Sequence, residues 1–216
     1  MDIQERLTAF ALLGATWVMW LLIALSVVSI AVILERLYFF LSTRDDIDAL
    51  RTRLTEALDS GDIARAHKAL ASSRSVEASI AQAGLDSVED GSKSAEERIQ
   101  GQQQLARLTM ERNLAYLGTL GNNAPFVGLL GTVIGIIRAF HSLDQNKGQV
   151  TSGLMADVGE ALVATAIGIL VALPAVAAFN YFQRIIKSRL ARGSALGSDI
   201  LSHLVSTRHA GARAAE

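Results

Sequence analysis

Three long stretches of this chain contain no charged residue. They are Ala9–Leu34, Asn113–Ile137 and Ala161–Gln183, with 26, 25 and 23 residues. About 20 apolar residues in a helix cross the hydrocarbon core of a bilayer, so each stretch is long enough. A buried helix of a soluble protein would normally show a polar stripe, whereas residues 17–34 include only two serines as polar residues. The sequence therefore predicts an integral membrane protein with three transmembrane helices.

The distribution of lysine and arginine predicts the side of the membrane on which each connecting segment lies. Segment 36–112 contains eleven of these residues and the segment after residue 183 contains six, whereas residues 138–160 contain only two. Basic residues are retained on the cytoplasmic side, so segment 36–112 and the C-terminus are predicted inside. The expected order is an external N-terminal tail (1–8), a first span (9–35), a cytoplasmic domain (36–112), a second span (113–138), an external loop (139–159), a third span (160–183) and a cytoplasmic tail (184–216).

The cytoplasmic segment is predicted to begin with two helices. Apolar residues recur at spacings of three and four within residues 47–58 and again within 63–70. Residues 59–62, with the sequence Asp-Ser-Gly-Asp, separate the two patterns as a turn. Residues 86–97 are polar and are expected to form a loop.

Long helical extensions of the second and third spans are also expected. A helix that starts near Ala95 can run straight into the second span, because no glycine or proline pair interrupts it at that junction. After the third span, the first helix-breaking residue is Gly193. We therefore expect both spans to continue into the cytoplasm as long helices.

Small residues form a seam along one face of the second span and of the third. Their gaps alternate between three and four residues, which keeps them on one side of a helix. In lipid, helices gain no hydrophobic free energy from meeting, so small residues that permit close backbone approach promote their contact. The seam comprises Gly118, Gly121, Pro125, Gly128, Thr132, Gly135 and Ala139 in the second span, and Ala161, Thr165, Gly168, Ala172 and Ala175 in the third. Two interpretations are open: simple helix packing, or the lining of a polar interior.

Each seam contains a single threonine, and the two threonines are expected at nearly the same depth. Thr132 lies six residues before Arg138, and Thr165 lies five residues after Glu160. At 1.5 Å per residue, these positions are about 9 and 8 Å from the outer ends of the spans. Glu160 itself begins the third span, where it would either stabilise a helix N-terminus or face a polar cavity.

The three charge-free stretches contain no Asp, Glu, Lys, Arg or His. A proton pathway needs a titratable group near the middle of the membrane. If this protein conducts protons, the titrating carboxylate must therefore come from another chain, and the seams would be the surface that receives it.

Other chemistry is not indicated by the sequence. The chain has no cysteine, and its four histidines show no metal-binding spacing. Residues 128–135 are rich in glycine but lack the lysine and hydroxyl residue of a phosphate-binding loop. With a net charge of −1, nothing favours nucleic acid binding. We expect no enzyme activity, no cofactor and no metal.

Two strings of residues in the second and third spans resemble a known family. They are Pro125–Val133 (PFVGLLGTV) with Gly135, and Glu160–Gly168 (EALVATAIG) followed by Leu173-Pro174-Ala175 and Asn180. Both are similar to the hallmark of the MotA/TolQ/ExbB proton-channel family, in its short three-span ExbB/TolQ branch. The similarity covers roughly residues 114–183, about a third of the chain, and the predicted topology agrees with it outside that region.

The resemblance implies an all-α membrane protein with three transmembrane helices and long cytoplasmic helical extensions. Such subunits form a homo-oligomeric, pentameric ring whose second and third spans line a central pore. By position, Thr132 and Thr165 match the pore-lining threonines of the family, and Glu160 matches its carboxylate at the outer end of the pore. The residues expected to pack the helices around this pore are Gly121, Pro125, Gly128, Gly131, Gly135, Ala161, Gly168, Ala172 and Pro174.

The resemblance also implies a function and partners. The chain would be a proton-channel stator subunit of an ion-motive-force-driven motor in the bacterial inner membrane, with its N-terminus in the periplasm. An ExbD/TolR-like single-span partner would supply a membrane Asp, and a TonB/TolA-like envelope-spanning protein would receive the work. The alternative is a non-conducting membrane scaffold that clusters a partner protein.

Overall fold

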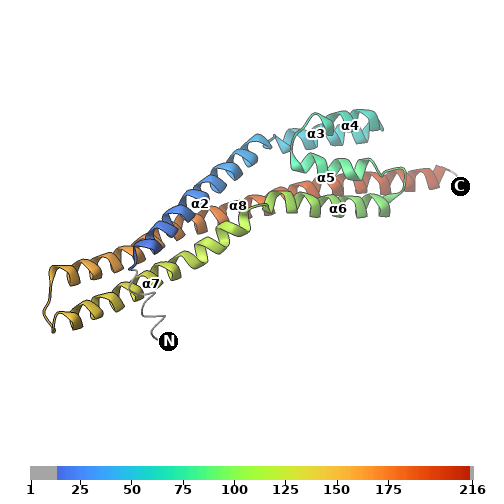
Figure 1. The fold of residues 1–216 in the computed structure, drawn as a ribbon. Helices are drawn as coiled ribbons and strands as arrows, with labels where there is room; N and C mark the ends of the chain where they lie inside the picture. The colour runs from blue at the N-terminus through green and yellow to red at the C-terminus, as the bar shows by residue number, and fades with distance from the viewer. Residues whose placement is uncertain (1–13, 215–216) are drawn as a thin grey trace. The chain divides into compact units, whose positions relative to one another are not determined.

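A computed structural model describes residues 14–214, and the side chains of residues 14–206. All regular secondary structure in this described part is α-helical, as the sequence predicts. Its helices are α2 (Thr16–Ser42), α3 (Ile47–Asp59), α4 (Ile63–Ala71), α5 (Val76–Leu85), α6 (Ser92–Glu111), α7 (Leu114–Gln145) and α8 (Ser152–Ala214), shown in Figure 1. The predicted N-terminal tail (1–8) and the first residues of the predicted first span (9–13) lie outside the described residues.

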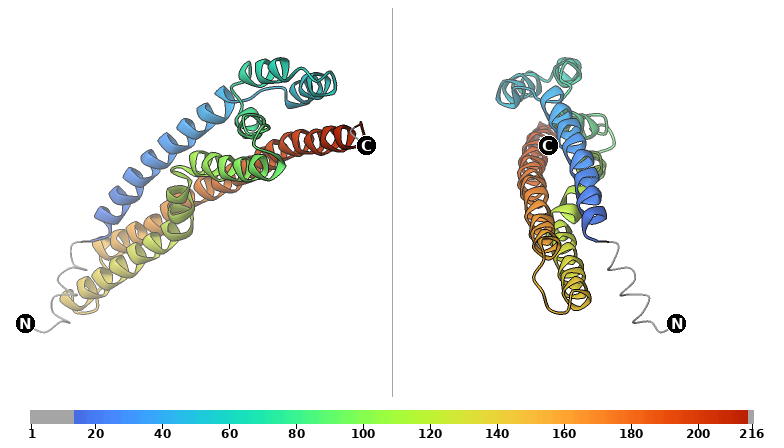
Figure 2. Two further views of the ribbon diagram at one scale, coloured as in Figure 1. Left: turned by 90° about the vertical axis from the view of Figure 1, so that its right-hand side faces the viewer. Right: turned by 60° about the vertical axis from the view of Figure 1, so that its left-hand side comes forward.

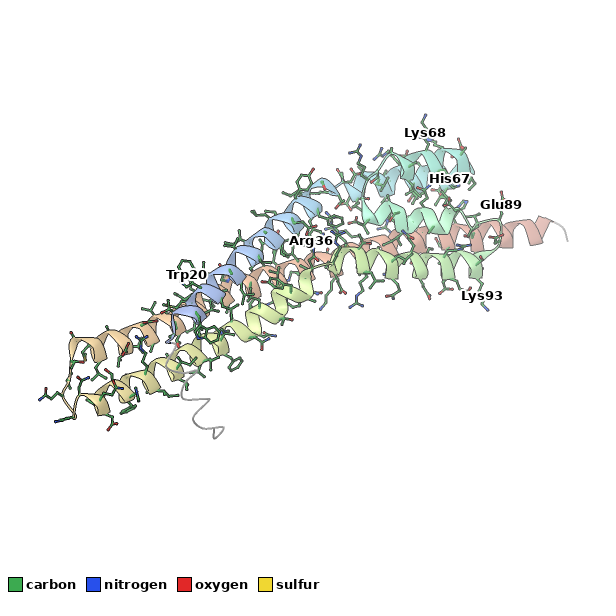
Figure 3. All side chains as sticks on the ribbon, in the orientation of Figure 1. Trp20, Arg36, His67, Lys68, Glu89 and Lys93 are labelled. Atoms are coloured by element: carbon green, nitrogen blue, oxygen red, sulfur yellow. The ribbon has the colours of Figure 1, made fainter. Side chains whose placement is uncertain are left out.

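Three of these helices, α2, α7 and α8, are long and apolar enough to cross a membrane. This finding agrees with the three charge-free stretches. Large apolar side chains are exposed along all three helices in the single chain, among them Trp20 (67% exposed, Figure 3), Phe126 and Leu170. Exposed apolar surface of this extent suits contact with lipid tails or with other apolar helices.

The chain divides into two compact units, and α2 and α8 each contribute to both. The first unit contains the described residues up to Glu35 together with Asn113–Tyr181. The second unit contains Arg36–Arg112 together with the described residues from Phe182 onward. The boundaries of the first unit therefore follow the charge-free stretches closely.

In the first unit, α7 and α8 lie side by side and are joined by residues 146–151 (Figures 1 and 2). The turn uses two residues with positive φ, Lys147 (51°) and Gly148 (79°). It is much shorter than the loop predicted at 139–159, because the charges that end an apolar span do not end its helix. The core of this unit consists of Val18, Leu22, Leu120, Ala124, Ile134, Val171, Ala172 and Ala175.

The second unit packs α3–α6 against the C-terminal part of α8. Asp46 and Asp62 cap α3 and α4 by accepting hydrogen bonds from Ala49 N and Arg65 N, and Gly61 between the helices has φ +69°. The two predicted helices and the turn between them are thus confirmed, whereas α5 was not predicted. The core residues are Ile47, Leu50, Leu54, Ala57, Leu58, Ala66, Leu70, Ala78, Ala81, Leu85, Leu196 and Ile200.

Of the two helix extensions expected from the sequence, the one that leads into the second span is wrong. The helix from the cytoplasmic domain does not run into the second span, because α6 ends at Glu111 and Asn113 adopts a left-handed conformation with φ 62°. Asparagine tolerates this conformation better than most residues, so one residue can break the helix without a glycine or proline. By contrast, the third span does continue as a long helix, because α8 runs to Ala214 and is not interrupted even at Gly193. A Cβ there would lie 2.7 Å from Ile80 Cδ1, so the glycine permits close packing instead.

A pair of oppositely charged side chains is buried in the second unit. Glu77 of α5 and Arg189 of α8 are 2% and 8% exposed, and Arg189 Nε lies 4.0 Å from Glu77 Oε1. Glu77 Oε2 is also buried and accepts no hydrogen bond from the described residues. Burial raises the pKa of Glu77 above the usual value of a glutamate, although the positive charge of Arg189 partly offsets this effect. Burial likewise lowers the pKa of Arg189.

Arg189 also completes the C-terminal end of α2. Its Nη1 donates to Thr43 O (3.2 Å) and to Thr43 Oγ1 (2.7 Å), and its Nη2 donates to Phe40 O (2.7 Å). The last carbonyls of a helix lack donors within the helix, and a positive charge is favourable beside them. The guanidinium therefore has two roles, since it pairs with Glu77 and caps α2.

Candidate functional site

The structure brings the two predicted threonines together between α7 and α8. Thr165 Oγ1 donates to Gly128 O at 3.0 Å, and it lies 3.5 Å from Thr132 Oγ1. Thr132 Oγ1 donates to Leu129 O of its own helix at 2.6 Å. Both side chains are partly exposed in the single chain. The two threonines, which were expected at nearly the same depth from their spacing to Arg138 and Glu160, are thus direct neighbours.

The threonines can meet because the backbones of α7 and α8 approach closely at two glycines. A Cβ on Gly128 would lie 2.9 Å from Ala164 O and 3.0 Å from Thr165 Cα. A Cβ on Gly168 would lie 2.7 Å from Ala124 O and 2.9 Å from Gly128 Cα. Since these neighbours are backbone atoms, no side-chain rotation could make room. Glycine at both positions sets the distance between the helices.

The same contact extends along the rest of the seam. Gly121 packs against the backbone and side chain of Val176, and Gly135 packs against Ala161. A Cβ added to Gly131 would lie 2.6 Å from Ala164 Cβ and would also contact Val18 of α2. Of the other predicted packing residues, Ala172 is buried, Pro125 is half-buried and Pro174 is exposed, both prolines lying inside their helices. Within one chain, the glycines of the seam therefore lie where α7 and α8 pack closely against each other.

Glu160 does not stabilise a helix N-terminus, so that alternative is wrong. The helix α8 begins at Ser152, more than two turns earlier, so residues 152–159 before Glu160 are already helical. Glu160 Oε1 instead accepts a hydrogen bond from Thr16 Oγ1 at 2.6 Å. The carboxylate is half-buried and links α8 to the first residue of α2.

Two further charged residues near Glu160 were not predicted to be part of the site. Arg138 Nε of α7 lies 3.3 Å from Asp157 Oδ1 of α8. The Asp157 side chain is only 14% exposed. The sequence offered one signal, because Arg138 directly follows the second charge-free stretch and Asp157 is the next charged residue before Glu160 at the same end of the hairpin.

Among the described residues, no group of three or more His, Cys, Asp or Glu side chains could hold a metal ion. The contacts between the spans are thus made by hydroxyls, backbone carbonyls and small apolar groups, with ionisable residues at the end of the hairpin. Hydroxyls can both donate and accept hydrogen bonds, so this arrangement can bind a carboxylic acid or a water molecule.

Comparison with known proteins places this arrangement in a family. The family model of the MotA/TolQ/ExbB proton channel family matches residues 72–194, more than half of the chain. The chain belongs to the MotA/TolQ/ExbB proton channel family. The resemblance seen in the sequence is thereby confirmed, and the matched region of this family member includes Thr132, Glu160 and Thr165 as well as Glu77 and Arg189.

Curated relatives of this family member include both ExbB and TolQ proteins. It is 41% identical over 91 residues to the biopolymer transport protein ExbB of Xanthomonas campestris, which covers 42% of this chain and 36% of the relative. It is 44% identical over 79 residues to ExbB of Salmonella typhimurium (37% and 32%), and 42% identical over 74 residues to the Tol-Pal system protein TolQ of Pseudomonas aeruginosa (34% and 32%). The chain thus spans about a third of the length of these relatives.

Proposed function

We propose that this chain is a proton-channel subunit of a motor driven by the ion-motive force in the bacterial inner membrane. The observation that supports this function best is the meeting of Thr132 and Thr165 between two stretches, 113–137 and 161–183, that contain no Asp, Glu, Lys, Arg or His. The chain acts as a channel and stator subunit and not as an enzyme.

The two hydroxyls provide polar contacts for a carboxylic acid that the chain itself lacks. A titratable group near mid-membrane is needed to relay protons, and a membrane Asp on an ExbD/TolR-like single-span partner supplies it. The Thr165 hydroxyl donates to a backbone carbonyl. By rotating its side chain it can instead bond to a water molecule or to the partner's Asp, without any movement of the backbone. Each proton that crosses the membrane provides about 2.3 kcal/mol per 100 mV.

The proposed assembly is a pentameric ring of this chain, with α7 and α8 lining the central pore. The exposed apolar side chains of α7 and α8, such as Phe126, Val133 and Leu162, are consistent with neighbouring copies or lipid around a single chain. The N-terminus and residues 146–151 lie on the periplasmic side, and the second unit lies in the cytoplasm. A TonB/TolA-like envelope-spanning protein receives the work.

Thr165→Val tests this function directly. Valine has nearly the same shape but cannot form a hydrogen bond, so the assembly should remain intact while proton flux falls at least about tenfold, the effect of 1.4 kcal/mol. Thr165→Ser keeps the hydroxyl and should retain most of the flux. The measurement is proton uptake by vesicles that contain the chain together with its single-span partner, driven by a potassium diffusion potential.

A non-conducting scaffold is the competing function, and the glycine contacts between α7 and α8 favour it to some extent because they require no hydroxyl. A scaffold would tolerate replacement of both Thr132 and Thr165 by valine. Full energy-dependent activity of that double variant would therefore overturn the channel proposal.

A further inference from the structure

The end of the first unit near residues 146–151 contains a polar cluster built from three helices. Thr16 at the start of α2 donates to Glu160 of α8. Arg138 of α7 pairs with Asp157, which precedes Glu160 by three residues on the same face of α8. The guanidinium lies against Gly14, where an added Cβ would collide with Arg138 Nη1. Gly14 also has φ +83°, so both sterics and backbone favour glycine at this position.

The close approach of α7 and α8 fixes the ion pair beside the carboxylate. One turn from Arg138 and Asp157, a Cβ on Gly135 would lie 2.5 Å from Ala161 Cβ and 3.3 Å from Asp157 O. The backbones therefore cannot separate at this level without loss of packing. Asp157 is mostly buried, so Arg138 is its neutralising partner in the described structure.

We propose that the Arg138–Asp157 ion pair sets the electrostatic potential at the outer entrance of the proton pathway, beside Glu160. The inference rests on the proposed channel function and adds two residues to it. With the pair intact, the charges of Arg138 and Asp157 cancel, and Glu160 provides the local negative charge that attracts protons. Arg138 and Asp157 are thus positioning and tuning residues, and Glu160, held by Thr16, remains the acid at the outer end of the proposed pathway.

The other charged residues nearby are exposed and have a smaller effect on the potential beside Glu160 than Arg138 and Asp157 have. On α7, His141 and Asp144 are exposed, and His141 contacts Gln145. Lys147 in the turn is exposed as well. The described part of α2 up to Leu34 contributes no charged residue. Exposed charges are screened by salt over roughly 8–10 Å, whereas the partly buried Asp157 is screened less.

The inference predicts opposite effects for the two halves of the pair. Asp157→Asn leaves Arg138 unbalanced, which lowers the local proton concentration and moves half-maximal flux to a more acidic external pH. Arg138→Gln leaves Asp157 unbalanced and moves half-maximal flux to a more alkaline external pH. For a unit charge about 8 Å from the entrance in a water-like medium, each shift is about 0.4 pH unit. The double variant Arg138→Gln/Asp157→Asn should return to the wild-type value.

The test measures proton flux against external pH in vesicles that contain the full chain and its single-span partner, at low salt and at roughly 1 M salt. Opposite shifts that cancel in the double variant and shrink in salt support the inference, and Arg138→Lys should behave as wild type. If an amide variant does not assemble, Asp157→Ala and Arg138→Ala give the same charge states.

Three results would overturn the inference. A purely structural role would lower flux in both single variants without moving the midpoint. Complete loss of flux in an assembled single variant would also contradict it, because an electrostatic effect of this size shifts the curve without removing it. Absence of flux in the wild-type complex would overturn the channel function and this inference with it. The first two results would overturn only the inference, so the two kinds of failure can be told apart.

Discussion

Replacing Arg189 with methionine is expected to lower the free energy of unfolding of the second unit by about 3–5 kcal/mol. Methionine fills a similar volume, but the Glu77 carboxylate would stay buried without its counter-charge, and Phe40 O and Thr43 O would lose their donor. Pulse proteolysis across a urea titration of the full chain in detergent micelles measures the change. Lys187→Met, at an exposed position of the same helix, is the matched control and should change stability by less than about 0.5 kcal/mol.

The pH dependence of the same measurement separates the charge from the packing. The pKa of Glu77 is raised in the folded unit, so the folded state binds a proton more tightly than the unfolded chain does. Stability should therefore fall as the pH rises from the unfolded-state pKa through the folded-state pKa. Glu77→Gln should remove this dependence and should also recover much of the loss in an Arg189→Met background. An Arg189→Met variant as stable as wild type would show that Glu77 is protonated or solvated at neutral pH.

The parts of the fold that could be predicted from the sequence are those that depend on local physical rules. The spans follow from the cost of charges in lipid, which excludes ionisable residues from three long stretches. The ends of α3 and α4 follow from Asp46 and Asp62 as caps, and from Gly61 between them. Each of these signals acts within a few residues of the feature that it determines.

Other features could not be predicted, because they depend on the backbone conformation of one residue or on contacts between distant residues. The break at Asn113 involves a single left-handed residue, and the apolar periodicity on either side gives no sign of it. In the sequence, Arg189 served only as one of the six basic residues after residue 183 that predict the orientation of the chain. In the structure, its guanidinium caps α2 and pairs with Glu77 of α5. Such pairings require the mutual packing of three helices, which spacing along the chain does not encode.

The candidate site shows the same division. The proximity of Thr132 and Thr165 followed from their depths in an antiparallel pair of helices, which is simple arithmetic on the helix rise. The partner of Glu160 did not follow, because the register of α2 against α8 decides whether Thr16 can reach it. The start of α8 at Ser152 could not be located from charge either, since a helix can continue past the edge of an apolar span.

Gly168→Ala is expected to produce the largest effect in the first unit. The added methyl would lie 2.7 Å from Ala124 O and 2.9 Å from Gly128 Cα, so α7 and α8 must move apart. Overpacking of this kind costs about 1–3 kcal/mol, and separation would also stretch the bond from Thr165 Oγ1 to Gly128 O. The expected result is a lower thermal midpoint of the helical signal in detergent, together with loss of proton flux.

Gly159→Ala is the matched control for stability, because it lies on the same helix and an added Cβ has no neighbour within 4 Å. Alanine has a higher helix propensity than glycine, so this variant should be as stable as wild type or up to about 1 kcal/mol more stable. Both substitutions add one methyl group to a helical glycine. They differ only in the neighbours of that methyl group, which are backbone atoms of α7 at Gly168 and absent within 4 Å at Gly159. If both melted at the same temperature, α7 and α8 would have to be farther apart at Gly168 than the structure places them, and the two hydroxyls would then be too far apart to serve one proton.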